Sequence, residues 1–97
     1  MVIYDRVFSR ASGRIKKGDL CYQIRLSCEK EILSGKPFRF AVFQGRSESP
    51  LQLVVCEKFF PTLESAEIEI EQTVAEIIGR GFKRTSPRRY PDSLLGV

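Results

Sequence analysis

A single stretch near the C-terminus, Thr62 to Phe82, carries the strongest helical pattern in the chain. Its apolar residues recur at steps of three and four, which places them on one side of a helix that turns once every 3.6 residues. These residues are Ala66, Ile70, Thr73, Val74, Ile77 and Ile78. A helix with one apolar side must bury that side, so the rest of the chain has to supply an apolar surface for it.

Both ends of this stretch have the residues that begin and end helices. Thr62 or Ser65 can accept a hydrogen bond from a free amide of the first turn. Gly79 and Gly81 can adopt the left-handed conformation that ends a helix, and Phe82 can fold back onto the last turn. We therefore expect the helix to be well defined at both ends.

Four segments before the helix have the composition and the pattern of β-strands. The clearest is Leu20 to Cys28, whose apolar and polar residues alternate strictly, so that one side belongs to the core and the other faces water. Turn residues separate the segments, and Pro61 ends the last one. The four segments are Val2 to Ser9, Leu20 to Cys28, Phe38 to Phe43 with the pattern ending at Gln44-Gly45-Arg46, and Leu51 to Phe60.

The order of these elements predicts an α+β domain, in which an antiparallel four-stranded sheet has one C-terminal helix packed on one face. We expect the opposite face to be partly open and to present Gln23, Arg25, Arg39 and Phe43. Residues 1–83 form this single domain. Residues 84–97 contain two prolines and no periodicity, so they are expected to run as an extended tail.

Length and composition indicate one small soluble domain. Ninety-seven residues suffice for one core, and 42% hydrophobic with 29% charged residues is typical of folded proteins rather than of disordered ones. No apolar run approaches the roughly 18 residues of a membrane span, and Met1 to Arg10 is too short and too charged for a signal peptide. We expect a cytoplasmic protein with no membrane partner.

The cysteine and histidine content argues against catalysis and metal binding. The chain has no histidine, which excludes Ser-His and Cys-His nucleophile pairs and histidine metal sites. Cys21, Cys28 and Cys56 lack the CxxC spacing of zinc sites, and Cys21 and Cys28 fall on opposite sides of one strand. We therefore expect no enzymatic activity, no metal and no cofactor.

The net charge of +4 conceals an uneven distribution. The predicted helix from Thr62 to Gly79 has five Glu and no Lys or Arg, which leaves sixteen basic and seven acidic residues, or +9, in the rest of the chain. The basic residues gather at Arg6, Arg10, Arg14, Lys16 and Lys17 near the N-terminus and at Arg80, Lys83, Arg84, Arg88 and Arg89 after the helix. A polyanion would bind away from the helix.

Three local motifs accompany this order of elements. Leu20 to Leu26 places an aromatic residue before alternating aliphatics, and Phe43 to Arg46 ends the third strand with a Gly-Arg pair. The third motif consists of Phe59 or Phe60, Leu63 to Ala66, Ile77 and Gly81-Phe82. From about residue 20 to residue 83 the chain resembles the WGR domain, a small module of poly(ADP-ribose) polymerases and several bacterial proteins, with Gln44 in place of the signature Trp. The resemblance implies a non-catalytic module that binds nucleic-acid ends or packs against a partner domain.

The first functional hypothesis is a small non-enzymatic nucleic-acid-binding module that contacts phosphates through basic loops and the tail. Glycine before Arg46 allows close backbone approach, guanidinium groups match phosphate geometry, and an aromatic ring can stack on a base or contact a sugar. The residues assigned to this site are Arg14, Lys16, Lys17, Arg46, Lys83, Arg84, Arg88, Arg89, Phe43 and Tyr90.

The alternative hypothesis is a protein-protein interaction module. It would use the open sheet face or the apolar end of the tail, residues 94–97, to dock onto a partner or onto a second copy of the chain. Salt distinguishes the two hypotheses, because only phosphate contacts release counterions and weaken steeply as salt rises.

Overall fold

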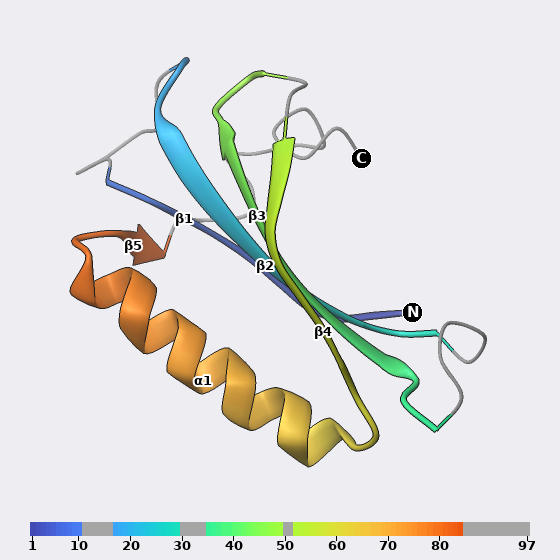
Figure 1. Ribbon diagram of the computed structural model, residues 1–97. Helices are drawn as coiled ribbons and strands as arrows, with labels where there is room; N and C mark the ends of the chain where they lie inside the picture. The colour runs from blue at the N-terminus through green and yellow to red at the C-terminus, as the bar shows by residue number, and fades with distance from the viewer. Residues whose placement is uncertain (11–16, 30–34, 50–51, 85–97) are drawn as a thin grey trace.

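The computed structural model describes residues 1–10, 17–29, 35–49 and 52–84. Four long strands precede one α-helix, and a two-residue strand follows it (Figure 1). The elements are β1 (Val2–Ser9), β2 (Leu20–Cys28), β3 (Phe38–Arg46), β4 (Gln52–Phe60), α1 (Leu63–Gly79) and β5 (Lys83–Arg84). The long elements match the segments predicted from the sequence, because each has either a local period of two or of 3.6 residues or, as in β1, a composition rich in aromatic and β-branched residues.

The strands form one antiparallel sheet in the order β4-β3-β2-β1-β5. The helix packs across one face of this sheet, so the predicted α+β class is confirmed (Figure 1). The sheet also contains β5, which was not predicted because two residues show no periodicity. Arg84, placed at the start of the expected tail, pairs with Phe8 in this strand. The remainder of the tail lies outside the described residues.

The core lies between α1 and the sheet face that it covers. The helix contributes Ala66, Ile70 and Ile77, which are buried as predicted. The other buried members are Phe8, Ile24, Leu26, Phe40, Val42 and Phe82. Ile78 was expected in the same stripe, but it is 54% exposed. One residue beyond Ile77 lies about 100° further around the helix, which turns Ile78 out of the buried row.

Hydrogen bonds define both ends of α1. Thr62 Oγ1 accepts a hydrogen bond of 3.2 Å from an amide of the first turn, as predicted for the N-cap. At the other end Gly81 has φ +93°, and the amides of Gly81 and Phe82 donate to the carbonyls of Ile78 and Ile77 at 2.9 and 3.2 Å. This pair of bonds is the Schellman motif. It turns the chain back so that Phe82 is only 2% exposed.

The sheet face turned away from α1 carries paired polar groups. Gln23 Nε2 donates to Asp5, Arg25 forms an ion pair with Asp5 at 3.3 Å, and Arg39 Nε donates to Glu57 at 2.6 Å. This face is less open than the sequence led us to expect, because polar side chains pair across neighbouring strands. Its buried residues include Val7, Cys21, Gln23 and Ala41.

Candidate nucleic-acid interface

Six exposed cations from five parts of the chain lie at one end of the sheet, where β1 and β3 end, β2 begins and α1 leads into β5 (Figure 1). The register establishes this arrangement, since Ser9 pairs with both Cys21 and Lys83, and Leu20 pairs with Arg46. We call these six residues the basic end: Arg10, Lys17, Arg46, Arg80, Lys83 and Arg84.

Three hydrogen bonds join the segment before β2 to the turn after β3. The amide of Gly18 donates to the carbonyl of Ser47 at 3.1 Å, and the amide of Ser47 donates to the carbonyl of Asp19 at 2.8 Å. Arg46 Nη1 also donates to the carbonyl of Gly18 at 3.1 Å. These contacts hold Lys17 and Arg46 in neighbouring positions, although they are far apart in the sequence.

Arg46 begins a tight turn and keeps most of its hydrogen-bonding capacity. The amide of Ser49 donates to the Arg46 carbonyl at 3.0 Å, and Glu48 adopts the left-handed conformation with φ +63°. The bond to Gly18 uses one of the five guanidinium N–H donors. The exposed guanidinium group can therefore still present a planar fork of donors, which is the geometry that phosphate oxygens accept.

Phe82 fixes the part of the basic end that follows the helix. Its ring packs edge-on against Tyr22, with 4.9 Å between centroids, and the Arg10 guanidinium carbon lies 4.9 Å from its centroid. The next residue, Lys83, pairs with Ser9 of β1. The buried ring thus holds Arg10 and the cations of β5 on the same side of the domain, while these residues stay exposed.

Half of the ten Asp and Glu residues in the described part of the chain lie on the helix. Glu64, Glu67 and Glu71 are exposed on α1, and Glu69 Oε2 accepts a hydrogen bond of 2.8 Å from Lys58 Nζ. This hydrogen bond is the largest cause of the raised pKa of Lys58, and the negative charge of Glu69 is the second cause. The carboxylates nearest the basic end are Asp19 and Glu48 in its two turns and Glu76 one turn before Arg80. The cations of the basic end outnumber these carboxylates, so its local charge is positive.

The structure brings together four of the predicted site residues, Lys17, Arg46, Lys83 and Arg84. The predicted residues Arg14, Lys16, Arg88, Arg89 and Tyr90 lie outside the described residues. Arg10 and Arg80 belong to the basic end, although the residues assigned to the site from the sequence did not include them. Their positions, directly after a strand and at the helix C-cap, were the signal that could have identified them.

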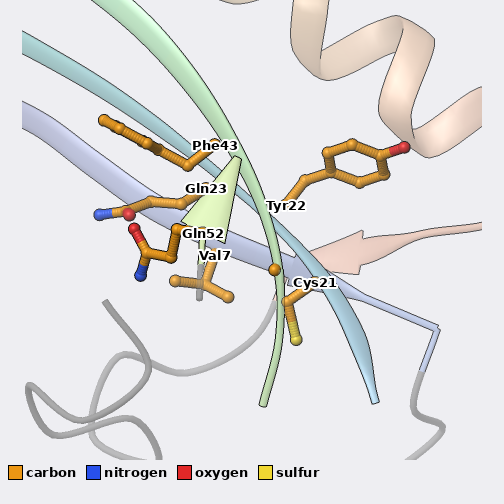
Figure 2. Close-up of a pocket in the computed structure, with 7 residues that line it drawn as sticks. Val7, Cys21, Tyr22, Gln23, Phe43 and Gln52 are labelled. Atoms are coloured by element: carbon orange, nitrogen blue, oxygen red, sulfur yellow. The ribbon is translucent and has the colours of Figure 1, made fainter. Parts of the chain in front are cut away.

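Phe43, the remaining predicted residue, lies on the sheet face turned away from α1. Figure 2 shows Phe43, Gln23 and Gln52 on one side of the strands, whereas Tyr22 points to the other side, toward the helix. These residues line a cavity of about 10 Å³, which is room for about one water molecule. A nucleobase cannot enter this space, so Phe43 could contact one only through the exposed part of its ring.

Cys21 lines the same small cavity and is 3% exposed. Burial, and to a smaller extent the charge of Asp19, raise the pKa of the Cys21 thiol to about 11. The thiol is therefore neutral near pH 7, which suits a packing role rather than nucleophilic chemistry.

A larger cavity of about 450 Å³ lies between α1 and strands β3 and β4. Its charged lining consists of Lys58, Glu69, Glu76 and Arg80, so both signs of charge face it. No group of three residues that could hold a metal ion occurs in the part of the chain that the structure describes. The basic end, by contrast, carries mainly positive charge and has the chemistry of an anion-binding surface.

Comparisons with protein-family models, with curated proteins and with solved structures found no match for this chain. Among the residues that the structure describes, no helix has both the length and the apolar character needed to cross a membrane.

Proposed function

We propose that this protein is a small non-enzymatic module that binds nucleic acid by contacting phosphates with its basic end. The observation that carries the proposal is the convergence of Arg10, Lys17, Arg46, Arg80 and the two cations of β5 from five chain segments. Scattered surface cations serve solubility, whereas a concentrated positive patch attracts the regularly spaced charges of a phosphate backbone.

The helix is acidic and the basic end is positive, so a bound polyanion should prefer one orientation on the domain. The exposed glutamates of α1 repel phosphates, and on the sheet face away from α1 Arg25 and Arg39 are already paired with Asp5 and Glu57. A strand of nucleic acid would therefore run across the end of the sheet rather than over either face. The contacts are to the backbone, so binding is expected to depend weakly on base sequence.

The position of Gly45-Arg46 supports the same function. The pair ends β3, at the position of the signature of the WGR domain, a module whose resemblance implies binding to nucleic-acid ends or packing against a partner domain. Arg46 is exposed there and is held beside Lys17 by the joined turns. Arg and Lys at adjacent points of one rigid surface can contact successive phosphates.

Matched charge reversals test the proposal. Binding to labelled nicked duplex, blunt duplex and single-stranded DNA and RNA is measured at about 50 and about 200 mM salt. If all six cations contact phosphates of a duplex, affinity should fall about 10³-fold over this range. Lys83→Glu should weaken binding about ten-fold and make the salt dependence shallower by about one unit of slope.

Lys36→Glu provides the control. Lys36 is also exposed, but it lies just before β3, at the other end of the sheet, and its reversal changes the net charge equally. The proposal predicts that Lys36→Glu has a much smaller effect than Lys83→Glu. Equal effects would mean that only net charge matters, and no binding at about 50 mM salt would rule the function out.

A further inference from the structure

The cavity between α1 and strands β3 and β4 has the size of a small-ligand site. Its volume of about 450 Å³ falls within the range of about 300–1,000 Å³ that is usual for such sites. Val42 and Ile77 give it apolar surface, and so does Tyr22, whose side chain points toward the helix (Figure 2). Polar side chains line the rest, so the cavity suits a flat ring that has apolar faces and a polar edge.

Two polar side chains of this cavity are free to bind a ligand. Lys58 and Glu69 neutralise each other, because Lys58 Nζ lies 2.8 Å from Glu69 Oε2. Among the described residues, the side chains of Gln44 and Glu76 form no ion pair and no hydrogen bond, although both line the cavity. The charge of Glu76 is the smallest of the causes that raise the pKa of Lys58. The Glu76 carboxylate can therefore accept hydrogen bonds from a ligand, and the Gln44 amide can donate or accept them.

Arg80 connects this cavity with the basic end. It lines the cavity one helical turn after Glu76, and it is also one of the six cations of the basic end. On β3, Gln44 lies two residues before Arg46. A nucleotide whose phosphate contacts Arg80 therefore has the cavity within reach of its base.

The free carboxylate favours one kind of base. Negative charge disfavours a phosphate inside the cavity and favours N–H donors. Guanine presents two neighbouring N–H donors, the ring N1–H and the N2 amino group, and these match the two oxygens of one carboxylate. Adenine and cytosine place a ring acceptor beside their amino group, and thymine places a carbonyl on each side of its ring N–H. With these bases an acceptor would face the Glu76 carboxylate, whereas guanine also offers O6 to a donor of the Gln44 amide.

We propose that this cavity binds an unpaired guanine, whose Watson–Crick edge donates to Glu76 while its phosphate lies against Arg80. The inference rests on the proposed function, because the basic end has to hold the strand. In a duplex the same edge of guanine is paired with cytosine, so only single-stranded segments and unpaired ends gain from the cavity. Duplex binding through phosphates is still expected to depend weakly on base sequence.

A single guanine in a uniform strand tests the site. Binding of the full chain to a short oligothymidylate is compared, at about 50 mM salt, with binding to the same strand carrying one central guanine. The guanine should raise the affinity about ten-fold, as expected for one good bidentate contact to a base. Adenine in the same place should give no gain. Hypoxanthine, which lacks the N2 amino group, should give a much smaller gain than guanine.

Glu76→Gln tests the residue that contacts the base. The substitution keeps the shape of the side chain, removes its charge and replaces one acceptor oxygen by a donor. Oligothymidylate should bind somewhat more tightly, because a carboxylate near the basic end is lost, whereas the gain from guanine should disappear. Glu71→Gln is the matched control, since Glu71 is an exposed glutamate of the same helix that borders a different cavity. This control should keep the preference for guanine.

The outcomes of these measurements separate the guanine site from the proposed function. Equal binding of the two strands, or an equal gain from adenine, would overturn the guanine site and leave phosphate binding by the basic end intact. Absence of binding by either strand at about 50 mM salt would remove the proposed function and the guanine site together. A preference for guanine that survives in Glu76→Gln, or that is lost in Glu71→Gln, would contradict the role of Glu76.

Discussion

The two outer edges of the sheet are built differently. On one side the short strand β5 pairs with the end of β1, adds Lys83 and Arg84, and is held by the buried ring of Phe82. On the other side β4 runs for nine residues and exposes three consecutive apolar side chains at Leu53 to Val55. In the described part of the sheet, the first edge is charged and anchored, whereas the second combines an exposed apolar segment with the exposed and paired Glu57 and Lys58.

This contrast shows how one small domain can offer two kinds of surface. Under the proposed function, the β5 side would supply charge for a polyanion, because its cations are fixed by a core residue immediately before them. The β4 side supplies strand edge and apolar contact, which suit pairing with another strand. The two surfaces should therefore respond separately to substitution.

The largest effect is expected from removing the anchor of β5. Phe82→Ala deletes a ring that is 2% exposed and packs against Tyr22, and such losses typically lower the free energy of unfolding by about 3–5 kcal/mol. Urea denaturation measures the change. Ile78→Ala is the control, because Ile78, in the last turn of the preceding helix, is 54% exposed and should change stability by less than about 0.5 kcal/mol. Similar losses for the two variants would contradict the anchoring role of Phe82.

A smaller effect is expected at the glycine that directs the chain into β5. Gly81 has φ +93°, and a β-carbon added there would meet no other atom within 4 Å. Gly81→Ala should therefore destabilise through backbone strain alone, by about 1–2 kcal/mol. Gly79 has the same open space, but it ends the helix without a positive φ, so Gly79→Ala should stabilise by up to about 1 kcal/mol. Thermal unfolding of both variants would refute this account if the two shifts had the same sign.

The smallest expected effect is a difference in alkylation rate between two thiols, that of Cys21 inside the sheet and that of Cys56 on the edge strand β4. Cys21 is 3% exposed, whereas Cys56 on β4 is half-buried, so alkylation at pH 8 should label Cys56 well before Cys21. Mass spectrometry of the labelled peptides measures the order, and faster labelling of Cys21 would show that the edge thiol is not the more accessible one.

The raised pKa of the Cys21 thiol predicts that the stability of the fold depends on pH in the alkaline range. The folded-state pKa of about 11 exceeds the ordinary value of 9.0, so the folded state retains the proton that the unfolded chain releases first. Stability should be intact below pH 9 and decline as pH rises from 9 to 11. Denaturation midpoints of Cys21→Ala should show less of this decline, and an identical decline would assign it to other groups.

The sequence predicted the fold better than it predicted the site. The strict alternation of Leu20 to Cys28 and the helical stripe of Ala66, Ile70 and Ile77 depend on local periods, which the structure retains. Strand β5 could not be predicted, because its pairing with β1 is a long-range contact of two residues. The exposure of Ile78 was missed because the width of a helical stripe depends on what it packs against.

The basic end was only partly predictable for the same reason, because the sequence shows local patterns but not long-range contacts. The sequence showed that cations gather near the N-terminus and after the helix, but not that Arg46 would lie beside Lys17 or Arg10 over the ring of Phe82. Those contacts arise from the register of β1, β2 and β3. The open sheet face was overestimated for a related reason, because the ion pairs of Arg25 and Arg39 join different strands.

The most direct test of the central claim is an amide chemical-shift titration of the whole protein with a short DNA duplex at about 50 mM salt. We predict shifts concentrated at residues 17–18, 46–47 and 80–84, with residues 36 and 64–71 unaffected, and their loss at about 200 mM salt. Shifts centred on the helix glutamates or on the face away from α1, or no shifts at low salt, would contradict binding by the basic end.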